Sequence, residues 1–292
     1  MRKMQVQCPA KVNLFLEITG KRPDGYHRLA TLFAKINLYD VLDMTTDQTG
    51  KIKFESEFEP SDDNLVVRAA KAFFREFSIG QGVTIKLTKR IPVGAGLGGG
   101  SSDAAGTLMG LAKIYDIELT APRRKRLFNL GVKLGADVPF FLHPANFCLG
   151  TGIGDKLKTV EVKNSLPYMV LVYPNIHVST VESYKNLAKP ERADVLTRMS
   201  HLDRLLSGLR TGRPVGEWAP LLFNRLEQAR LPALAQVEQA RSILERSGAV
   251  GARMSGSGSA VFGFVGSHTE GERLVKRLQG YPWQVFLTSC HG

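Results

Sequence analysis

The first strand of the chain can be recognised from an alternating pattern of apolar and polar positions. Apolar residues recur at every second position from Val12 to Ile18, which is the period of a β-strand with one face against a core. Lys11 and Asn13 fall on the alternate positions, so their side chains share the other face of this strand. The pattern therefore predicts a half-buried strand that presents an ammonium group beside an amide.

The same reasoning along the rest of the chain predicts a mixture of strands and helices. Further strands are expected at 32–44, 51–58, 83–88, 168–173, 250–254, 260–265 and 284–288. Helices are expected at 64–77, 101–114, 120–134, 195–210, 215–229, 232–246 and 269–279. The character of the pattern changes near residue 160, so we expect two domains, residues 1–160 and 161–292, of the α+β class.

Composition places the chain among globular proteins. Its 292 residues are 43% hydrophobic and 23% charged, which excludes collagen-like, coiled-coil and mostly disordered chains. No apolar run approaches the roughly 18 residues that a membrane-spanning helix needs. Lys3, Lys11 and Glu17 interrupt the N-terminal segment, so a signal peptide is not expected and the predicted location is cytoplasmic.

The net charge of +12 predicts an anionic partner. Nucleic acid, lipid head groups and a polyphosphorylated small molecule all fit this charge, which cannot distinguish among them. Cys8, Cys148 and Cys290 lack the spacing of metal or redox sites, so we interpret them as reduced structural thiols. The six histidines show no paired ligand spacing, and a zinc site is not expected.

A glycine-rich loop is the strongest chemical signal. Five of the seven residues from 94 to 100 are glycine, and the loop lies between a predicted strand and a predicted helix that begins at Ser101. Such a loop lets backbone amides approach a ligand closely, and the helix N-terminus adds a positive dipole end. The arrangement predicts a phosphate site, to which the hydroxyls of Ser101 and Ser102 can contribute contacts to phosphate oxygens or to a Mg²⁺ ion.

Two well-known phosphate loops fit this segment poorly. Gly94, Gly96 and Gly99 formally satisfy the dinucleotide-binding spacing, with Glu118 as the ribose acid, but the loop follows several strands instead of the first strand of a βαβ unit. The lysine that a P-loop ATPase places before its Ser or Thr is absent. A dinucleotide-dependent oxidoreductase and a nucleic-acid-binding protein nevertheless stay open as alternatives at this point.

Two shorter segments also indicate chemistry. Residues 255–259, SGSGS, lie between predicted strands and can expose backbone amides to a ligand. Asp137 lies among apolar residues in the segment GADVPFF, where it is either a cap for the local backbone or a partly desolvated catalytic base.

Taken together, these segments resemble the GHMP kinases. That superfamily has three motifs, and the chain carries PAKVNLFL at 9–16, PVGAGLGGGSS at 92–102 and ARMSGSGSAVFG at 252–263 in the same order. The resemblance implies a two-domain fold with an N-terminal ribosomal S5 domain 2-like α/β layer domain and a C-terminal ferredoxin-like α+β domain. It also places the active site in the cleft between the domains, with ATP and Mg²⁺ as cofactors and homoserine or mevalonate kinases as alternatives within the superfamily.

The resemblance assigns roles to individual residues. It implies that Lys11 and Asp137 form the catalytic pair, with Asn64 and Lys89 near the adenine or ribose of ATP. It further implies that the triphosphate is bound by the segment Pro92, Val93, Gly94, Ala95, Gly96, Leu97, Gly98, Gly99, Gly100, Ser101 and Ser102. Ser102 is the candidate metal contact.

A narrower resemblance concerns the acceptor substrate. The segments PAKVNLFLEITGKRPDGYH and LGADVPFFL are similar to those of a kinase family whose acceptor is a cytidine diphosphate derivative. This resemblance implies that the substrate is bound by Asn13, Tyr26, His27 and Tyr184. Nucleic acid and membrane are then not expected as partners, and the chain is expected as a monomer or weak homodimer. One departure is Arg225, which follows Asn224 where the family commonly has Asp.

Overall fold

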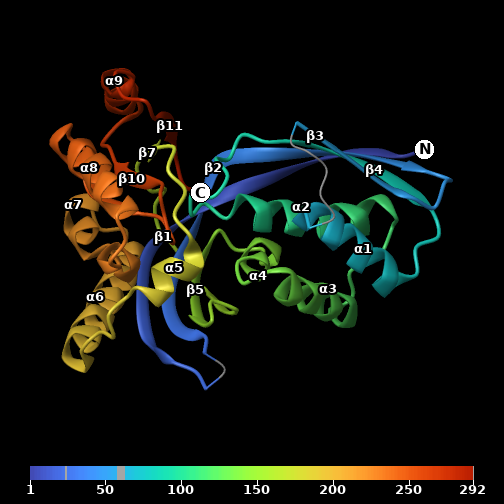
Figure 1. Cartoon of the computed structure of the whole chain (residues 1–292), viewed down its shortest axis with the longest axis horizontal. Helices are drawn as coiled ribbons and strands as arrows, with labels where there is room; N and C mark the ends of the chain where they lie inside the picture. The colour runs from blue at the N-terminus through green and yellow to red at the C-terminus, as the bar shows by residue number, and fades with distance from the viewer. Residues whose placement is uncertain (24, 58–62, 292) are drawn as a thin grey trace. The chain divides into compact units, whose positions relative to one another are not determined.

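The computed structural model describes residues 1–23, 25–57 and 63–291 (Figure 1). Phe58, the last residue of the strand predicted at 51–58, lies outside these ranges. The chain divides into two compact units, and the divisions fall inside the strands β1 (Lys3–Lys21) and β2 (His27–Asp47). Unit 1 comprises Met1–Ala10, Leu38–Val93 and Gly98–Pro144, and unit 2 comprises Lys11–Asn37, Gly94–Leu97 and Ala145–Gly292.

Unit 1 is a sheet covered by helices on one face. Strand β3 (Ile52–Ser56) pairs in parallel with β4 (Gly82–Thr88), β4 pairs antiparallel with β2, and β1 follows at the other side of β2. The helices that cover this sheet are α1 (Leu65–Phe77), α2 (Gly99–Ile114), α3 (Ala121–Leu134) and α4 (Val138–Leu142). Their apolar side chains share one core with buried strand residues such as Leu42 and Ile85.

Small residues allow α2 to lie close to the strands of unit 1. A Cβ atom at Gly106 would lie 2.4 Å from Cys8 Sγ, and one at Gly110 would lie 2.8 Å from Met44 Sδ. Contacts this close leave no room for a larger side chain unless the helix or the neighbouring side chains shift. This packing fixes where the N-terminus of α2 emerges, directly after the glycine-rich loop.

Unit 2 contains a four-stranded antiparallel sheet in the order β11-β7-β10-β9, made of β7 (Met169–Tyr173), β9 (Val250–Met254), β10 (Val261–Phe264) and β11 (Gln284–Thr288). Numbered along the chain, this order is 4-1-3-2, the ferredoxin-like arrangement. Helices α8 (Ala233–Arg246) and α9 (His268–Leu278) pack on this sheet through a shared apolar core. The α+β fold expected from the resemblance is confirmed.

The remaining elements of unit 2 complete it around the second halves of β1 and β2. Strand β5 (Phe147–Gly152) pairs with β2, and β6 (Lys156–Thr159) pairs with β5. The helices here are α5 (Thr180–Lys185), α6 (Arg192–Thr211) and α7 (Val215–Trp218). The short β8 (Phe223–Asn224) pairs in parallel with β1, at Phe15↔Phe223 and Leu16↔Asn224.

Two expectations from the sequence are wrong. The helix predicted at 215–229 is replaced by α7, the 3₁₀ turn η1 (Ala219–Leu221), β8 and the 3₁₀ turn η2 (Arg225–Gln228). The strand at 12–18 is buried on both faces instead of one, because Phe15 and Glu17 are as inaccessible as the apolar residues that alternate with them. In the part of the chain that is described, no helix is long and apolar enough to cross a bilayer.

Candidate functional site

Four residues of the glycine-rich loop, Gly94–Leu97, belong to unit 2 and contact two other motifs there. The Ala95 carbonyl accepts the Ala260 backbone N–H at 3.0 Å, and the Gly96 carbonyl accepts the Ser255 hydroxyl at 3.0 Å. Gly96 has φ +76°, and a Cβ at this position would lie 2.1 Å from the Ser255 carbonyl oxygen. Only glycine fits here, so the second motif, which contains this loop, and the third motif are held at contact distance.

Lys11 lies against the same carbonyl. Its Nζ donates to the Gly96 oxygen at 2.9 Å and to Asn13 Oδ1 at 2.7 Å, and its backbone N–H donates to the Leu97 carbonyl at 2.9 Å. Asn13 Nδ2 in turn donates to Thr31 Oγ1 at 2.8 Å, which fixes the orientation of the amide. The sequence predicted that Lys11 and Asn13 share a strand face, and the structure confirms it. The orienting role of Thr31 has no signal in the sequence.

The other part of the loop leads into α2 in unit 1. Gly98 has φ +70° and precedes the helix, so that the backbone amides of the first turn of α2 follow the glycines directly. Pro92 and Ser102 are buried, whereas Val93 is 63% exposed. The Oγ atom of Ser102 and the Oδ1 atom of Asp103 are buried without a hydrogen-bond partner among the described residues.

Lys89 is the centre of a buried ion cluster in unit 1. Its Nζ contacts the carboxylates of Asp40 and Asp103, the latter at 2.9 Å. Burial alone would lower the pKa of Lys89, but the two carboxylates outweigh that effect and raise it. Burial raises the pKa of Asp103 to about 7, and Asp40 adds to the effect while Lys89 partly offsets it. The participation of Asp40 was not predicted from the sequence.

Asn64 and Asp137, also in unit 1, both precede helices. Asn64 is the N-cap of α1, and its side-chain oxygen accepts the Val66 backbone N–H at 2.9 Å. Asp137 precedes α4 and is partly exposed, and within the described chain its side chain does not accept a capping hydrogen bond from that helix. A side-chain cap of α4 by Asp137 is therefore not observed, and its role as a catalytic base stays a prediction.

The aromatic residues expected to bind the acceptor lie in unit 2. His27, at the start of β2, and Tyr184, in α5, stack with ring centroids 5.2 Å apart and an interplanar angle of 22°. Tyr26 is 63% exposed. Burial and the nearby Lys21 lower the pKa of His27, which favours the neutral imidazole. The structure thus brings together two residues that are 157 positions apart in the sequence.

Two observations indicate that the residues of the loop are suited to bind ATP and a metal ion. The positive φ angles of Gly94, Gly96 and Gly98 form a backbone cradle that no larger residue could adopt without strain. The unpartnered hydroxyl of Ser102 supplies an oxygen that a divalent cation or a phosphate can use. Among the described residues there is no cluster of three or more His, Cys, Asp or Glu side chains that would hold a metal alone.

Comparisons with known proteins define the class. The model of the GHMP kinases N terminal domain matches residues 64–144, and that of the GHMP kinases C terminal domain matches residues 205–282. A homoserine kinase structure from Cytophaga hutchinsonii superposes with a TM-score of 0.77 over 99% of this chain and 95% of that chain, at 18% identity, which concerns the fold alone. The chain is a GHMP kinase, an enzyme that uses ATP.

More similar relatives narrow the assignment. A 4-diphosphocytidyl-2-C-methyl-D-erythritol kinase from Prosthecochloris aestuarii is 40% identical over 95% of this chain and 94% of its own length. A crystal structure of 4-(cytidine 5'-diphospho)-2C-methyl-D-erythritol kinase has a TM-score of 0.80 and 33% identity, and covers 99% of this chain and 100% of that chain. The chain therefore belongs to the 4-diphosphocytidyl-2-C-methyl-D-erythritol kinase family.

Proposed function

We propose that the chain transfers the γ-phosphoryl group of ATP to the 2-hydroxyl of 4-diphosphocytidyl-2-C-methyl-D-erythritol, which gives the 2-phosphate and ADP. The observation that carries this proposal is the similarity to kinases of that name over 95% of the chain, at 40% identity. The product belongs to the non-mevalonate route to isoprenoid precursors. The stacked pair of His27 and Tyr184 supports a substrate with a nucleobase, because aromatic faces bind bases with little sequence specificity.

Asp137 and Lys11 carry the chemical step in this proposal. The acceptor hydroxyl is a weak nucleophile until its proton is removed, and the Asp137 carboxylate accepts that proton as the oxygen attacks the γ-phosphorus. The bond from the γ-phosphorus to the bridging oxygen breaks, and ADP leaves. Lys11 neutralises negative charge on the transferring group, and its contacts with Asn13 and Gly96 fix where its ammonium lies.

The glycine-rich loop supplies orientation and electrostatic stabilisation. The amides of residues 94–102 and the N-terminus of α2 bind the phosphate oxygens, with Ser102 as the residue that would hold Mg²⁺. When it is bound with ATP, Mg²⁺ offsets the charge of the β- and γ-phosphates. Lys89 and Asn64 are proposed to border the nucleoside. We propose residues 1–160 as the ATP-binding and catalytic domain and 161–292 as the C-terminal GHMP kinase domain.

The proposal is tested by ADP release with Mg-ATP and each of four alcohols: 4-diphosphocytidyl-2-C-methyl-D-erythritol, mevalonate, homoserine and galactose. We expect turnover with the cytidyl substrate alone, and a loss of about 100-fold or more in Asp137→Asn. Asp203→Asn, an exposed aspartate on α6, is the matched control and should keep wild-type turnover. Turnover with a different alcohol would overturn the assigned substrate, and full activity of Asp137→Asn would overturn the assigned base.

A further inference from the structure

Asn224, at the end of β8, is buried with its side-chain amide fully used. It is 1% exposed, and its Nδ2 donates to the carbonyl oxygens of Met254 and Gly256, both at 2.8 Å. Its Oδ1 accepts the Leu226 backbone N–H at 3.0 Å. Two of these three hydrogen bonds go to residues 254–258, called here the 254–258 loop, which connects β9 to the residues before β10. The amide therefore holds the chain on both sides of Ser255.

The 254–258 loop contacts the residues proposed to act in phosphoryl transfer. Ser255 Oγ donates to the Gly96 carbonyl, which also accepts Lys11 Nζ. The Cβ position of Gly256 is 3.1 Å from Lys11 Nζ and 3.3 Å from Asn13 Oδ1, so this glycine packs directly on the ammonium and amide groups. A shift of the loop by a fraction of an ångström would therefore change the place of Lys11 and of the Gly96 carbonyl.

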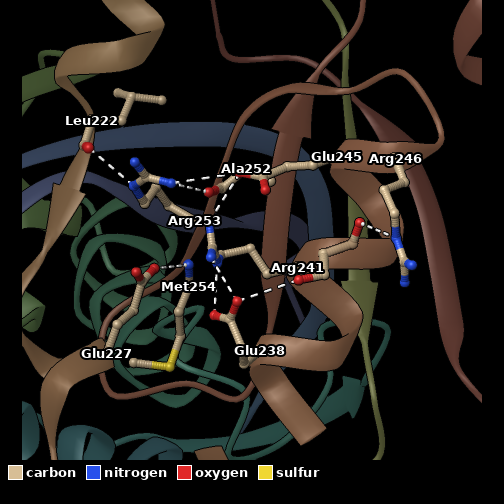
Figure 2. Close-up of polar contacts among 10 residues, drawn as sticks. Leu222, Glu227, Glu238, Arg241, Glu245, Arg246, Ala252, Arg253 and Met254 are labelled. Carbon is tan, nitrogen blue, oxygen red and sulfur yellow. Dashed lines mark hydrogen bonds and ion pairs between the residues drawn. The ribbon is translucent and has the colours of Figure 1, made fainter. Parts of the chain in front are cut away.

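Other contacts hold the start of the loop from the same segment as Asn224. Glu227, in η2, accepts the Met254 backbone N–H at 2.7 Å (Figure 2). Arg253 donates to the Leu222 carbonyl at 3.0 Å. Figure 2 shows these contacts beside the ion pairs of Arg241 with acidic residues of α8. Residues 222–227 thus fix the end of β9, and within this segment the Asn224 amide reaches past Ser255 to the Gly256 carbonyl.

The chemistry of the position requires an amide. Two carbonyl oxygens face the end of this side chain and need two N–H donors, which an asparagine Nδ2 supplies at the correct length. An aspartate of the same shape would place oxygen against both carbonyls. From this geometry we infer that Asn224 is a positioning residue for phosphoryl transfer: it holds the 254–258 loop against the Gly96 carbonyl and thereby fixes Lys11. The inference rests on the proposed function for the role of Lys11.

The test compares Asn224→Asp with Asn164→Asp. Asn164 is exposed, and its amide donates to the Gly212 carbonyl at 3.2 Å, so the control makes the same chemical change at a single carbonyl. We expect kcat to fall at least about tenfold in Asn224→Asp, with the acceptor KM within about threefold of wild type, since misplacement acts on the chemical step. Amide hydrogen exchange in residues 254–260 should accelerate, while exchange in β7 stays as in wild type.

A second variant keeps the test valid if Asn224→Asp does not fold. Asn224→Ala, Ser255→Ala and the double variant form a mutant cycle in kcat. We expect the fold-loss in the double variant to be smaller than the product of the two single fold-losses, because both residues act through the same loop. A double variant whose fold-loss in kcat equals the product of the single fold-losses would overturn the inference. Wild-type kcat and wild-type hydrogen exchange in folded Asn224→Asp would also overturn it, as would a loss of exchange protection that is spread evenly over unit 2. If wild type phosphorylates none of the alcohols, the proposed function fails, but hydrogen exchange still decides whether Asn224 holds the loop.

Discussion

The Arg225 guanidinium binds the Glu17 carboxylate through two hydrogen bonds, Nε to Oε1 at 2.8 Å and Nη2 to Oε2 at 2.6 Å. Both side chains are buried; Arg225 begins η2, which directly follows β8, and Glu17 lies in β1, the strand with which β8 pairs. Asp194, in the first turn of α6, contacts the same guanidinium at 2.7 Å. The Arg225 guanidinium is therefore neutralised by carboxylates from two distant segments.

Removal of Arg225 should destabilise the protein strongly. Arg225→Met leaves Glu17 buried without its cationic partner, so we expect the free energy of unfolding to fall by about 3–5 kcal/mol in urea titrations. The double variant Arg225→Met with Glu17→Gln should recover part of that loss. Arg213→Met is the control, because Arg213 pairs with Glu217 at the surface and should cost less than about 1 kcal/mol. Equal losses in the two arginine variants would contradict this account.

Lys11 should be required for turnover more than for binding. In Lys11→Met we expect kcat to fall by about 100-fold or more, because the charge that neutralises the transferring group is lost. The acceptor KM should change much less. Lys3→Met, at the exposed start of the same strand, serves as the control and should leave kcat unchanged. Steady-state ADP release measures both variants, and a kcat within threefold of wild type in Lys11→Met would refute the role.

Tyr184 should determine affinity for the acceptor. The rings of His27 and Tyr184 are in contact, so a base that binds between them must first separate them. A base that binds on the outer face of either ring instead stacks on the pair. Tyr184→Ala should raise the acceptor KM by about 10- to 100-fold, from roughly 1–3 kcal/mol of stacking, while Tyr184→Phe stays near wild type.

The KM for ATP should be unaffected in both Tyr184 variants, since the stacked pair concerns the acceptor only. Tyr281→Ala is a matched control, because Tyr281 also stacks on a ring, that of Trp283, with centroids 4.3 Å apart. An acceptor KM that rises as much in Tyr281→Ala as in Tyr184→Ala would show that the effect is not specific to the predicted substrate residues.

Elements with a strong local signal were predicted well from the sequence. The helix expected at 64–77 begins after the Asn64 cap, and the one expected at 101–114 begins two residues earlier, at Gly99. The segment 215–229 is not one helix although its apolar residues have helical spacing, because Pro220 follows α7 and Asn224 turns its amide to the 254–258 loop. A tertiary demand on one side chain overrode the local pattern there.

The contacts that build the site could not be read from the sequence for a different reason. Lys11 and Gly96 are 85 positions apart, and Glu17 and Arg225 are 208 positions apart. Periodicity reports only which face a residue occupies, so it places Lys11 beside Asn13 but cannot find the Gly96 carbonyl to which Lys11 donates. Glu17 illustrates the same limit, since a charged residue on the polar face of a strand predicts exposure and not a buried ion pair.

Substitution of Gly96 should affect ATP affinity directly. In Gly96→Ala the new Cβ would lie 2.1 Å from the Ser255 carbonyl oxygen, at a φ of +76°, so the loop must move. We expect the Kd for ATP, measured by calorimetry, to rise at least about tenfold, together with a loss of about 1–3 kcal/mol in stability. Gly216→Ala meets no atom within 4 Å and should bind ATP as wild type does. Unchanged affinity in Gly96→Ala would refute the cradle.

The contribution of Asp103 to the free energy of unfolding should fall as pH rises, because burial raises the pKa of its carboxyl group. Burial raises the pKa of Asp103 to about 7, well above the value near 4 expected in the unfolded chain, so the folded state binds the extra proton. That contribution is complete below the unfolded pKa and is lost as pH rises through about 7.

Asp103→Asn mimics the protonated side chain and removes this dependence. Relative to the variant, wild type should therefore lose about 1–2 kcal/mol of unfolding free energy between pH 5.5 and 7.5. Urea titrations of both proteins across that pH range give the difference in unfolding free energy. The contributions of the other titrating groups cancel in this difference, because both proteins share them. Asp43→Asn, at an exposed position of β2, is the control and should follow wild type at every pH. A wild-type stability that rises relative to Asp103→Asn with pH would mean that Lys89 holds the Asp103 carboxylate in its ionised form, because the ion pair would then outweigh the cost of burying the charge.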